Sequence, residues 1–222
     1  VSVMRRGEMV ASVKTSETTP EELAELMVGR KVLLEVDKTP AQPGKPILEV
    51  RDLRMVDIDK VERIRGISFD IRAGEIVGIA GVSGNGQQEL LRVISGEEAL
   101  AERFPVQICG VEAGRLSPGQ RRKLGLAFVP EERLGRGAVP GMSLADNALL
   151  TAAHSQGLLA GGFLRFGRAR AFAQRCIEAF NVKSGGPDAA AKSLSGGNLQ
   201  KFIVGREILQ APKLLVCAQP TW

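Results

Sequence analysis

The stretch that most limits the fold of this chain is the apolar run at residues 76–80, because it leads straight into a glycine-rich loop and a helical segment. A continuous apolar run of this length predicts a buried strand of a parallel sheet. The loop at 81–86 places its glycines where the chain leaves this strand and begins the helix expected at 87–94. Backbone N–H groups at such a junction can cradle an anion. We therefore expect a phosphate-binding loop on a parallel sheet.

Segments of strand and helix character alternate from residue 47 onward, which predicts an α/β fold with a parallel sheet core. Between residues 133 and 191 the β-branched runs give way to segments rich in Ala, Leu and Arg, so we expect a helical subdomain there. Further strands are expected within 47–53 and 67–81 and at 106–111, 126–129 and 214–217, and further helices from Ser117-Pro118, at 169–180 and at 197–209.

The first 35 residues form a small α/β segment with too few residues for a core of its own. Alternating apolar and polar residues around Arg6-Gly7 predict a β-hairpin. Thr19 and Pro20, followed by two acids, predict a helix start, and Gly29 predicts its end. Residues 36–46 hold three prolines among charged residues and predict an extended linker.

Composition and charge exclude several classes of protein. The formal net charge is +5, but the basic residues are scattered and aromatic residues make up only 4%, so no nucleic-acid partner is expected. No apolar run approaches the roughly 20 residues of a membrane-spanning helix, and no signal-peptide layout is present, so we expect a cytoplasmic protein. Three cysteines and one histidine without metal-ligand spacing argue against a zinc site. Arg121, Arg122 and Lys123 are expected on a solvated helix face, and His154 at the surface.

A second glycine-rich stretch, residues 192–201 (KSLSGGNLQK), predicts the start of another helix. Ser195 is a good N-cap, and Gly196 and Gly197 leave the first turn without bulky side chains. Bare N–H groups at the positive end of a helix form an anion site. The stretch resembles the LSGGQ signature of ATP-binding cassette (ABC) ATPases, with Asn198 where many members have glutamine. The positions that carry the resemblance are Leu194, Ser195, Gly196, Gly197, Asn198 and Gln200.

In ABC ATPases the signature closes over the γ-phosphate of an ATP held by the opposite cassette, so the resemblance implies half of a sandwich. The loop at 81–88 has the Walker A spacing, but Gln87 stands at the lysine position and Gln88 at that of the Mg²⁺-binding hydroxyl. Residues 214–221 resemble Walker B, with Ala218 for the metal-steadying aspartate and Gln219 for the catalytic glutamate. The expected nucleotide-binding positions are Gly81, Ser83, Gly84, Asn85, Gly86, Gln87, Gln88 and Glu131.

Four positions of one nucleotide site have thus lost their charge or hydroxyl together. A hydrogen bond to a charged group contributes about 1.5 to 3 kcal/mol, so losing the lysine weakens phosphate binding by roughly ten- to a hundredfold. Losing the general base removes a further factor of about 10² to 10⁴ from turnover. We expect weak nucleotide binding by this pocket, no metal ligand set, no catalytic residue and no hydrolysis by this chain alone.

The resemblance to ABC cassettes covers residues 47–222. It implies a P-loop NTPase-like cassette with a mostly parallel sheet core, antiparallel strands and a helical subdomain at about 133–191. Glu131 occupies the place of the Q-loop glutamine, which relays nucleotide state to membrane subunits. Three segments are similar to the second cassette of the fused, two-cassette ATPases that power bacterial sugar and nucleoside importers: GVSGNGQQEL, FVPEERLGRGAVPGMSLADNALL and LLVCAQPT.

This resemblance also implies cofactors and partners. Residues 1–35 look like the tail of the first cassette, and ATP and Mg²⁺ are implied mainly at that partner cassette's site. Transmembrane permease subunits and, indirectly, a solute-binding protein are the other implied partners, at the inner face of the cell membrane. The chain stops at Trp222, where the family continues with a D-loop, a switch histidine and further strands, so we expect an incomplete sheet with exposed apolar surface.

Two alternatives stay open. A soluble ABC ATPase of DNA repair or translation would share the motifs, but such proteins tend to carry long coiled-coil or basic arms, and no heptad run lies between Gly86 and Ser195. A non-catalytic scaffold that never closes on ATP would share them too. A salt-sensitive DNA or ribosome binding assay tests the first, and ATP crosslinking across a two-cassette dimer tests the second.

Overall fold

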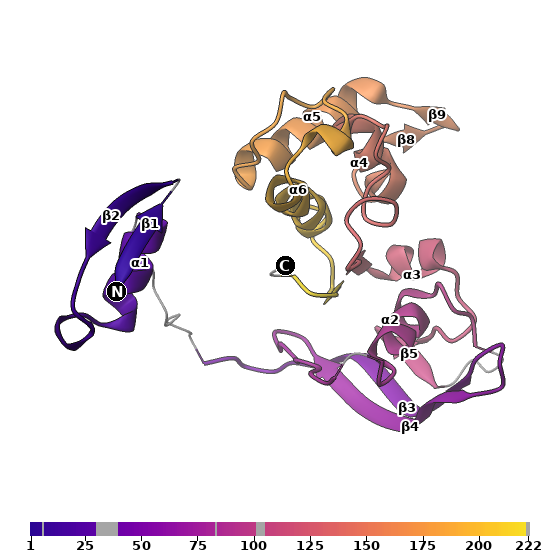
Figure 1. The fold of residues 1–222 in the computed structure, drawn as a ribbon. Coiled ribbons are helices and arrows are strands. Elements are labelled where there is room, and N and C mark those ends of the chain that lie inside the picture. Colours follow the sequence, from indigo (N-terminus) through magenta and orange to yellow (C-terminus); the bar gives the residue numbers. More distant parts are fainter. Residues whose placement is uncertain (6, 30–39, 83, 101–104, 221–222) are drawn as a thin grey trace. The chain divides into compact units, whose positions relative to one another are not determined.

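The computed structural model describes residues 1–5, 7–29, 40–82, 84–100 and 105–220 (Figure 1). The chain divides into two compact units, Val1–Ala41 and Gln42–Trp222, each with its own internal contacts. Within the described residues, no helix has both the length and the apolar character needed to cross a membrane.

The N-terminal unit is a β-hairpin followed by a short helix. Its elements are β1 (Ser2–Arg5), β2 (Glu8–Ser12), a 3₁₀ turn, η1 (Thr15–Glu17), and α1 (Pro20–Val28). The strands pair antiparallel, which confirms the predicted hairpin. Thr19 and Glu22 form a reciprocal capping box, and Gly29 ends the helix with a φ of 80°. Arg6 in the hairpin turn and the first part of the expected linker at 36–46 lie outside the described residues.

An antiparallel sheet with the strand order β4-β3-β5-β6 lies at one end of the second unit. Its strands are β3 (Pro46–Val56), β4 (Glu62–Arg72), β5 (Val106–Ile108) and β6 (Val111–Glu112). The two long strands confirm the strands expected from residue 47 onward. The single strand predicted at 106–111 is wrong in its middle, because Cys109 and Gly110 adopt φ angles of 52° and 76° and turn the chain back on itself.

A parallel pair of short strands joins this sheet to the helical part of the unit. β7 (Leu126–Val129) and β10 (Leu214–Cys217) pair along their whole length, as predicted. Leu126 and Phe128 pack into the apolar cluster beneath the antiparallel sheet, whereas Val129 packs into the cluster between the helices. The pair therefore contributes to both hydrophobic cores.

The strand predicted at residues 76–80 is wrong, because this stretch has no regular secondary structure. Its apolar side chains face solvent, and Ile76 is 95% exposed. No strand among the described residues pairs with it, since the parallel ladder there consists of β7 and β10. Ordering a segment as a strand costs backbone entropy, and without a neighbouring strand no ladder hydrogen bonds offset that cost. An apolar pattern alone is therefore not enough to form a strand. Ile76, Val77 and Ile79 therefore expose apolar surface.

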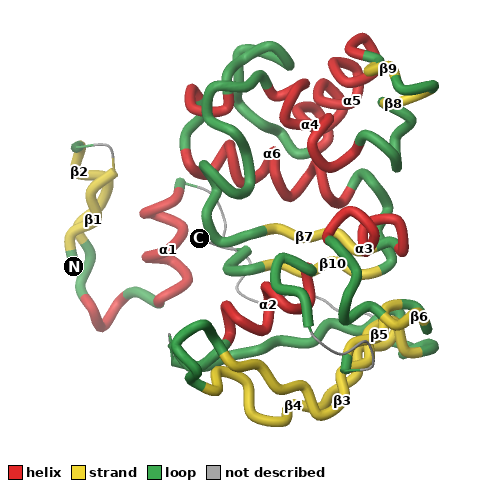
Figure 2. Tube along the Cα trace, turned by 90° about the vertical axis from the view of Figure 1, so that its right-hand side faces the viewer, coloured by secondary structure: helices red, strands yellow, loops and turns green. Residues whose placement is uncertain are grey.

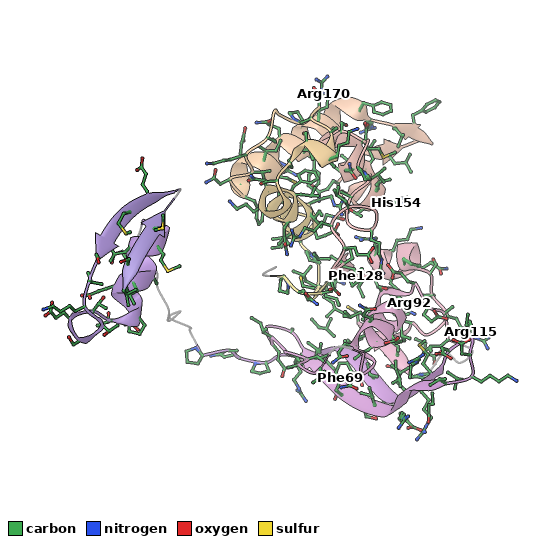
Figure 3. The ribbon with its side chains drawn as sticks, in the orientation of Figure 1. Phe69, Arg92, Arg115, Phe128, His154 and Arg170 are labelled. Carbon is green, nitrogen blue, oxygen red and sulfur yellow. The ribbon has the colours of Figure 1, made fainter. Side chains whose placement is uncertain are left out.

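Helices cover both sides of the parallel pair. They are α2 (Gln87–Ser95), α3 (Pro118–Leu124), α4 (Leu144–Ala152), α5 (Phe166–Ala179) and α6 (Gly196–Ile208). Figure 2 shows α4, α5 and α6 on one side of β7 and β10, with α2 and the antiparallel sheet on the other. Residues 133–191, where a helical subdomain is expected, contain α4 and α5 joined by loops, together with a small hairpin, β8 (Leu159–Ala160) with β9 (Phe163–Leu164). A 3₁₀ turn, η2 (Ala191–Ser193), follows. His154 lies exposed after α4, as predicted (Figure 3).

The predicted solvated face at residues 121–123 is wrong for Arg121, whose side chain is fully buried. Its guanidinium donates to the carbonyl oxygens of Val93 and Ile94, the last of these at 2.8 Å, and so satisfies the C-terminal end of α2. It also donates to Leu116 O at 2.9 Å. Burial lowers the pKa of Arg121 to about 10, which leaves it charged at neutral pH. A basic residue thus fixes the far end of the helix that begins at the phosphate loop.

Candidate functional site

The loop expected to hold phosphate leads into α2 at Gly86, which caps the helix with a φ of 97°. A Cβ at Gly86 would lie 2.8 Å from the carbonyl oxygen of Arg63, so only glycine fits there. The side chain of Gln87 folds back onto the loop, and its amide donates to Val82 O at 3.1 Å. Ser83 lies outside the described residues. The position of the phosphate-binding lysine is therefore occupied by a neutral amide that contacts the loop itself.

Glu131 joins the two ends of the predicted nucleotide pocket. One carboxylate oxygen accepts a hydrogen bond of 2.9 Å from the side-chain amide of Gln219, at the end of β10. The other lies 3.5 Å from the amide nitrogen of Gln88, on the first turn of α2. Gln88 and Glu131 are 43 positions apart in the sequence, and Glu131 and Gln219 are 88 positions apart. The structure brings all three together.

A cavity of about 460 Å³ lies beside these residues, between the loop, α2 and β10. Glu131 is the one charged side chain among the described residues that line it, and these include no lysine or arginine. Such a lining offers no positive charge to a triphosphate. The pocket therefore gives a nucleotide anion little electrostatic stabilisation beyond its loop N–H groups.

The residues present do not fit a Mg²⁺ ion. Mg²⁺ is usually bound through one or two carboxylates together with phosphate oxygens and water. Here Ala218 offers only a methyl group and Gln88 replaces the hydroxyl, so Glu131, whose carboxylate faces side-chain amides, is the one acidic group among the described lining residues. Gln219 cannot accept a proton from an attacking water, since an amide is not a base near neutral pH. At Gln88, Ala218 and Gln219 the chain therefore lacks the hydroxyl, the acid and the base of the Walker pattern.

The signature stretch begins α6 at Gly196, close to the predicted start. Ser195 holds the N-cap position, but its hydroxyl does not accept a backbone N–H, as a capping serine would. It accepts instead from the side-chain amide of Asn198 at 2.9 Å, and the carbonyl oxygen of that amide accepts from Lys183 N at 2.9 Å. Ser195, Gly196 and Gly197 are exposed, so the first N–H groups of the helix face outward.

Leu194 and Gln200 fix this helix start to the rest of the unit. Leu194 is half-buried and packs against the helical apolar cluster. The amide of Gln200 donates to the backbone oxygens of Gln219 and Pro220, at 3.3 and 2.7 Å. The signature helix therefore contacts the end of the strand that carries the Walker B position.

A buried ion network at the other end of α6 was not predicted from the sequence. Arg206 is 2% exposed and donates to Glu207, to Asn147 O in α4 and to Gly137 O. Glu207 is fully buried and also accepts from Arg122 of α3 at 2.7 Å. Burial lowers the pKa of Arg206, and the charge of Glu207 opposes that shift. The one sequence signal was an Arg-Glu pair inside an apolar helical run.

Residues 64–222 match the family described as ABC transporter. This chain belongs to the ABC transporter family. The glucose import ATP-binding protein TsgD13 of Haloferax volcanii is 41% identical over all of this chain and 40% of its own length. The nucleoside import ATP-binding protein NupA of Lactococcus lactis is 37% identical over all of this chain and 44% of its own length. The chain thus spans less than half the length of these two relatives.

Solved structures show the same cassette fold. The dimeric structure of MJ0796, a bacterial ABC transporter cassette, matches with a TM-score of 0.64 and 19% identity, over 79% of this chain and 75% of that one. A post-hydrolysis state of the same cassette, bound to ADP and phosphate, also has a TM-score of 0.64. The expected α/β ABC cassette fold is confirmed.

Proposed function

We propose that this chain is part of the ATP-binding subunit of an importer for simple sugars or nucleosides, in which its signature completes an ATP site whose Walker motifs belong to a partner cassette. The relatives named for glucose and nucleoside import support the substrate class. Permease subunits in the membrane, with a solute-binding protein behind them, are the corresponding partners. The cassette contacts the permease subunits at the inner face of the cell membrane.

The observation that supports this proposal is a contrast. The N-terminus of α6 is exposed, whereas the pocket beside Gln87 lacks the charged residues of the Walker pattern. The N–H groups of the exposed signature turn can face a phosphate that approaches from outside the chain. Among the described residues that line the pocket beside Gln87 there is no lysine, and alanine and glutamine stand at the two acidic positions of Walker B. A chain built in this way donates phosphate contacts to another cassette and hydrolyses nothing itself.

The domain organisation follows from the same proposal. Residues 1–35 are the tail of a first cassette, 36–46 the linker, and 47–222 the second cassette with its helical subdomain at about 133–191. The boundary between the two compact units, after Ala41, supports this division. So does the greater length of the relatives, which has room for another cassette.

In the proposed sandwich the residues of this chain bind and orient and do not break bonds. Gly196 and Gly197 let the γ-phosphate of the partner's ATP approach the helix N-terminus, and the Ser195 hydroxyl can donate to a phosphate oxygen while it accepts from Asn198. Mg²⁺ and the base belong to the partner cassette's site. The helix dipole and N–H groups stabilise negative charge that develops on the transferred phosphoryl group.

The test compares two substitutions in the native polypeptide that carries this chain. Ser195→Arg places a large side chain over the N-terminus of α6 and is expected to abolish ATP turnover. Gln87→Ala, in the pocket beside α2, is expected to leave turnover nearly unchanged. Ser193→Arg is the matched control, because it adds the same side chain at an exposed position two residues upstream. The reverse pattern, with Gln87→Ala inactive and Ser195→Arg active, rejects the proposal.

A further inference from the structure

Side-chain amides and one carboxylate form a chain of polar contacts that crosses the pocket from the signature helix to the phosphate-loop helix. Gln200 of α6 donates to the backbone oxygens of Gln219 and Pro220. The side chain of Gln219 donates to Glu131 at 2.9 Å, and Gln88 of α2 lies 3.5 Å from the other oxygen of that carboxylate. Protein groups alone therefore connect α6, the end of β10, the segment at Glu131 and α2.

Two of these positions carry exchanged residue types relative to the ABC pattern. The family has glutamine in the Q-loop and glutamate at the end of Walker B, and this chain has Glu131 and Gln219. An amide and a carboxylate can form the same hydrogen bond in either arrangement. In this chain the bond is made with the amide at the Walker B position and the carboxylate at the Q-loop position.

The backbone at Gln219 provides an independent observation. Its φ is 46°, in the left-handed region that residues other than glycine rarely adopt. Such a conformation persists only where the surroundings enforce it. The backbone carbonyl oxygen of Gln219 accepts from the side chain of Gln200, and its side-chain amide donates to Glu131. These contacts, rather than local preference, hold the strand end in this form.

We propose that Gln88, Glu131 and Gln219 form a metal-independent bridge that holds the segment after Glu131 and, through Gln200, the signature helix. This inference rests on the proposed function, since a signature that serves a partner's ATP needs a fixed position whatever its own pocket holds. Glu131 and Gln219 are positioning residues in this scheme. They connect these segments by direct hydrogen bonds between protein groups.

The charges of the bridge allow a test that distinguishes it from ordinary packing. Gln219→Glu places two carboxylates within hydrogen-bond distance, which is unfavourable unless a divalent cation binds between them. Combining Gln219→Glu with Glu131→Gln restores one amide and one carboxylate. Glu131→Ala removes the acceptor for both amides. Glu132→Ala is the matched control, because Glu132 is the neighbouring carboxylate and is exposed.

The experiment measures hydrogen–deuterium exchange of peptides covering residues 130–142 and 214–220 in the native polypeptide, in EDTA and in Mg²⁺. Wild type and Glu132→Ala are expected to exchange equally slowly in both. Glu131→Ala is expected to exchange about tenfold faster or more, the loss that one charge-assisted hydrogen bond predicts. Gln219→Glu exchanges fast in EDTA and slowly in Mg²⁺, and the double variant is slow in both.

Three results overturn the bridge: wild-type protection that requires Mg²⁺, a Glu131→Ala variant that matches Glu132→Ala, or a double variant as unprotected as Gln219→Glu. Should Glu131→Ala fail to fold, the comparison of Gln219→Glu with the double variant decides alone. Turnover of Ser195→Arg is measured separately. Normal turnover of Ser195→Arg rejects the proposed function. The bridge is then tested by the hydrogen–deuterium exchange results alone.

Discussion

The two helix N-termini of this cassette, at α2 and at α6, have similar sequences and different surroundings. Both follow a glycine-rich turn, yet α2 begins beside a side-chain amide that folds back on the loop, and α6 begins with an exposed Ser-Gly-Gly turn. At α2 the side chain of Gln87 donates to the loop and that of Gln88 approaches Glu131, whereas at α6 the turn is exposed and the guanidinium of Arg133 lies beside Gly196. Two glycine-rich helix starts thus differ according to the side chains that follow the last glycine, which are Gln87 and Gln88 at α2 and Asn198 at α6.

The largest effect is expected from Gly197→Leu, which tests whether the open end is a docking surface. No heavy atom lies within 4 Å of a Cβ at Gly197, so the chain itself has room for the side chain. Turnover of the native polypeptide should fall by about 10² or more, as on loss of phosphate-stabilising donors. Thermal stability should be unchanged or slightly higher, because leucine has the better helix propensity.

Gly167→Leu is the matched control for that substitution. Gly167 is also the second residue of its helix, α5, and also has open space around it. It should keep both turnover and stability. Equal loss of turnover in the two variants would remove the distinction between the signature turn and any other exposed helix start.

Glu207→Ala should have the next largest effect, on stability. It leaves buried Arg206 without its carboxylate and releases Arg122, at the opposite end of α6 from the signature. Breaking a buried pair by removing one partner costs about 3 to 5 kcal/mol of unfolding free energy. Urea unfolding of the variant measures this cost, and exposed Glu132→Ala should stay within about 0.5 kcal/mol of wild type. A similarly small change for Glu207→Ala would contradict the network.

Gln87→Lys tests whether the missing lysine weakens nucleotide binding at the N-terminus of α2. A lysine at this position should raise the affinity of the pocket for ATP by roughly ten- to a hundredfold, through a hydrogen bond to a charged group. Hydrolysis there should stay absent, because Gln219 and Ala218 still offer no base and no metal ligand. Photolabelling with 8-azido-ATP and peptide mapping measures the affinity, with Gln87→Met as the uncharged control. New hydrolysis in Gln87→Lys would show that the lysine alone had been limiting.

The smallest effect concerns the cysteines. Burial raises the pKa of Cys176 to about 12 and also raises that of Cys217, so the thiolate is scarce at neutral pH. Cys176 lies in the helical core, and Cys217 is half-buried at the end of β10. Iodoacetamide should label Cys176 only after unfolding, and Cys217 earlier, as strand β10 opens. Rapid labelling of native Cys176 would contradict the packing of the helical subdomain.

Local signals in the sequence were enough to predict the ends of helices. Thr19 and Ser117 each form the capping box that their spacing indicates, and Gly86 precedes α2 as expected. Capping depends on residues within one turn, so sequence spacing determines it. The same reasoning placed the start of α6 but misjudged how Ser195 bonds, because Asn198 competes for its hydroxyl.

Features that depend on distant partners could not be predicted in this way. The apolar run at 76–80 has the pattern of a strand, but a strand also needs a neighbour that local sequence does not supply. Arg122 and Glu207 meet across 85 positions, and Arg121 reaches back 27 positions to α2. For the site, residue types at the Walker positions predicted a neutral pocket, while the bond between Glu131 and Gln219 emerged only from the fold.

The most direct test of the account counts nucleotides trapped by orthovanadate during turnover in the native polypeptide. The account predicts a single trapped nucleotide per polypeptide, which is lost in Gly197→Leu and retained in Gln87→Ala. Two trapped nucleotides in wild type, or loss of trapping in Gln87→Ala, would show that the pocket of this cassette takes part in hydrolysis and would contradict the account.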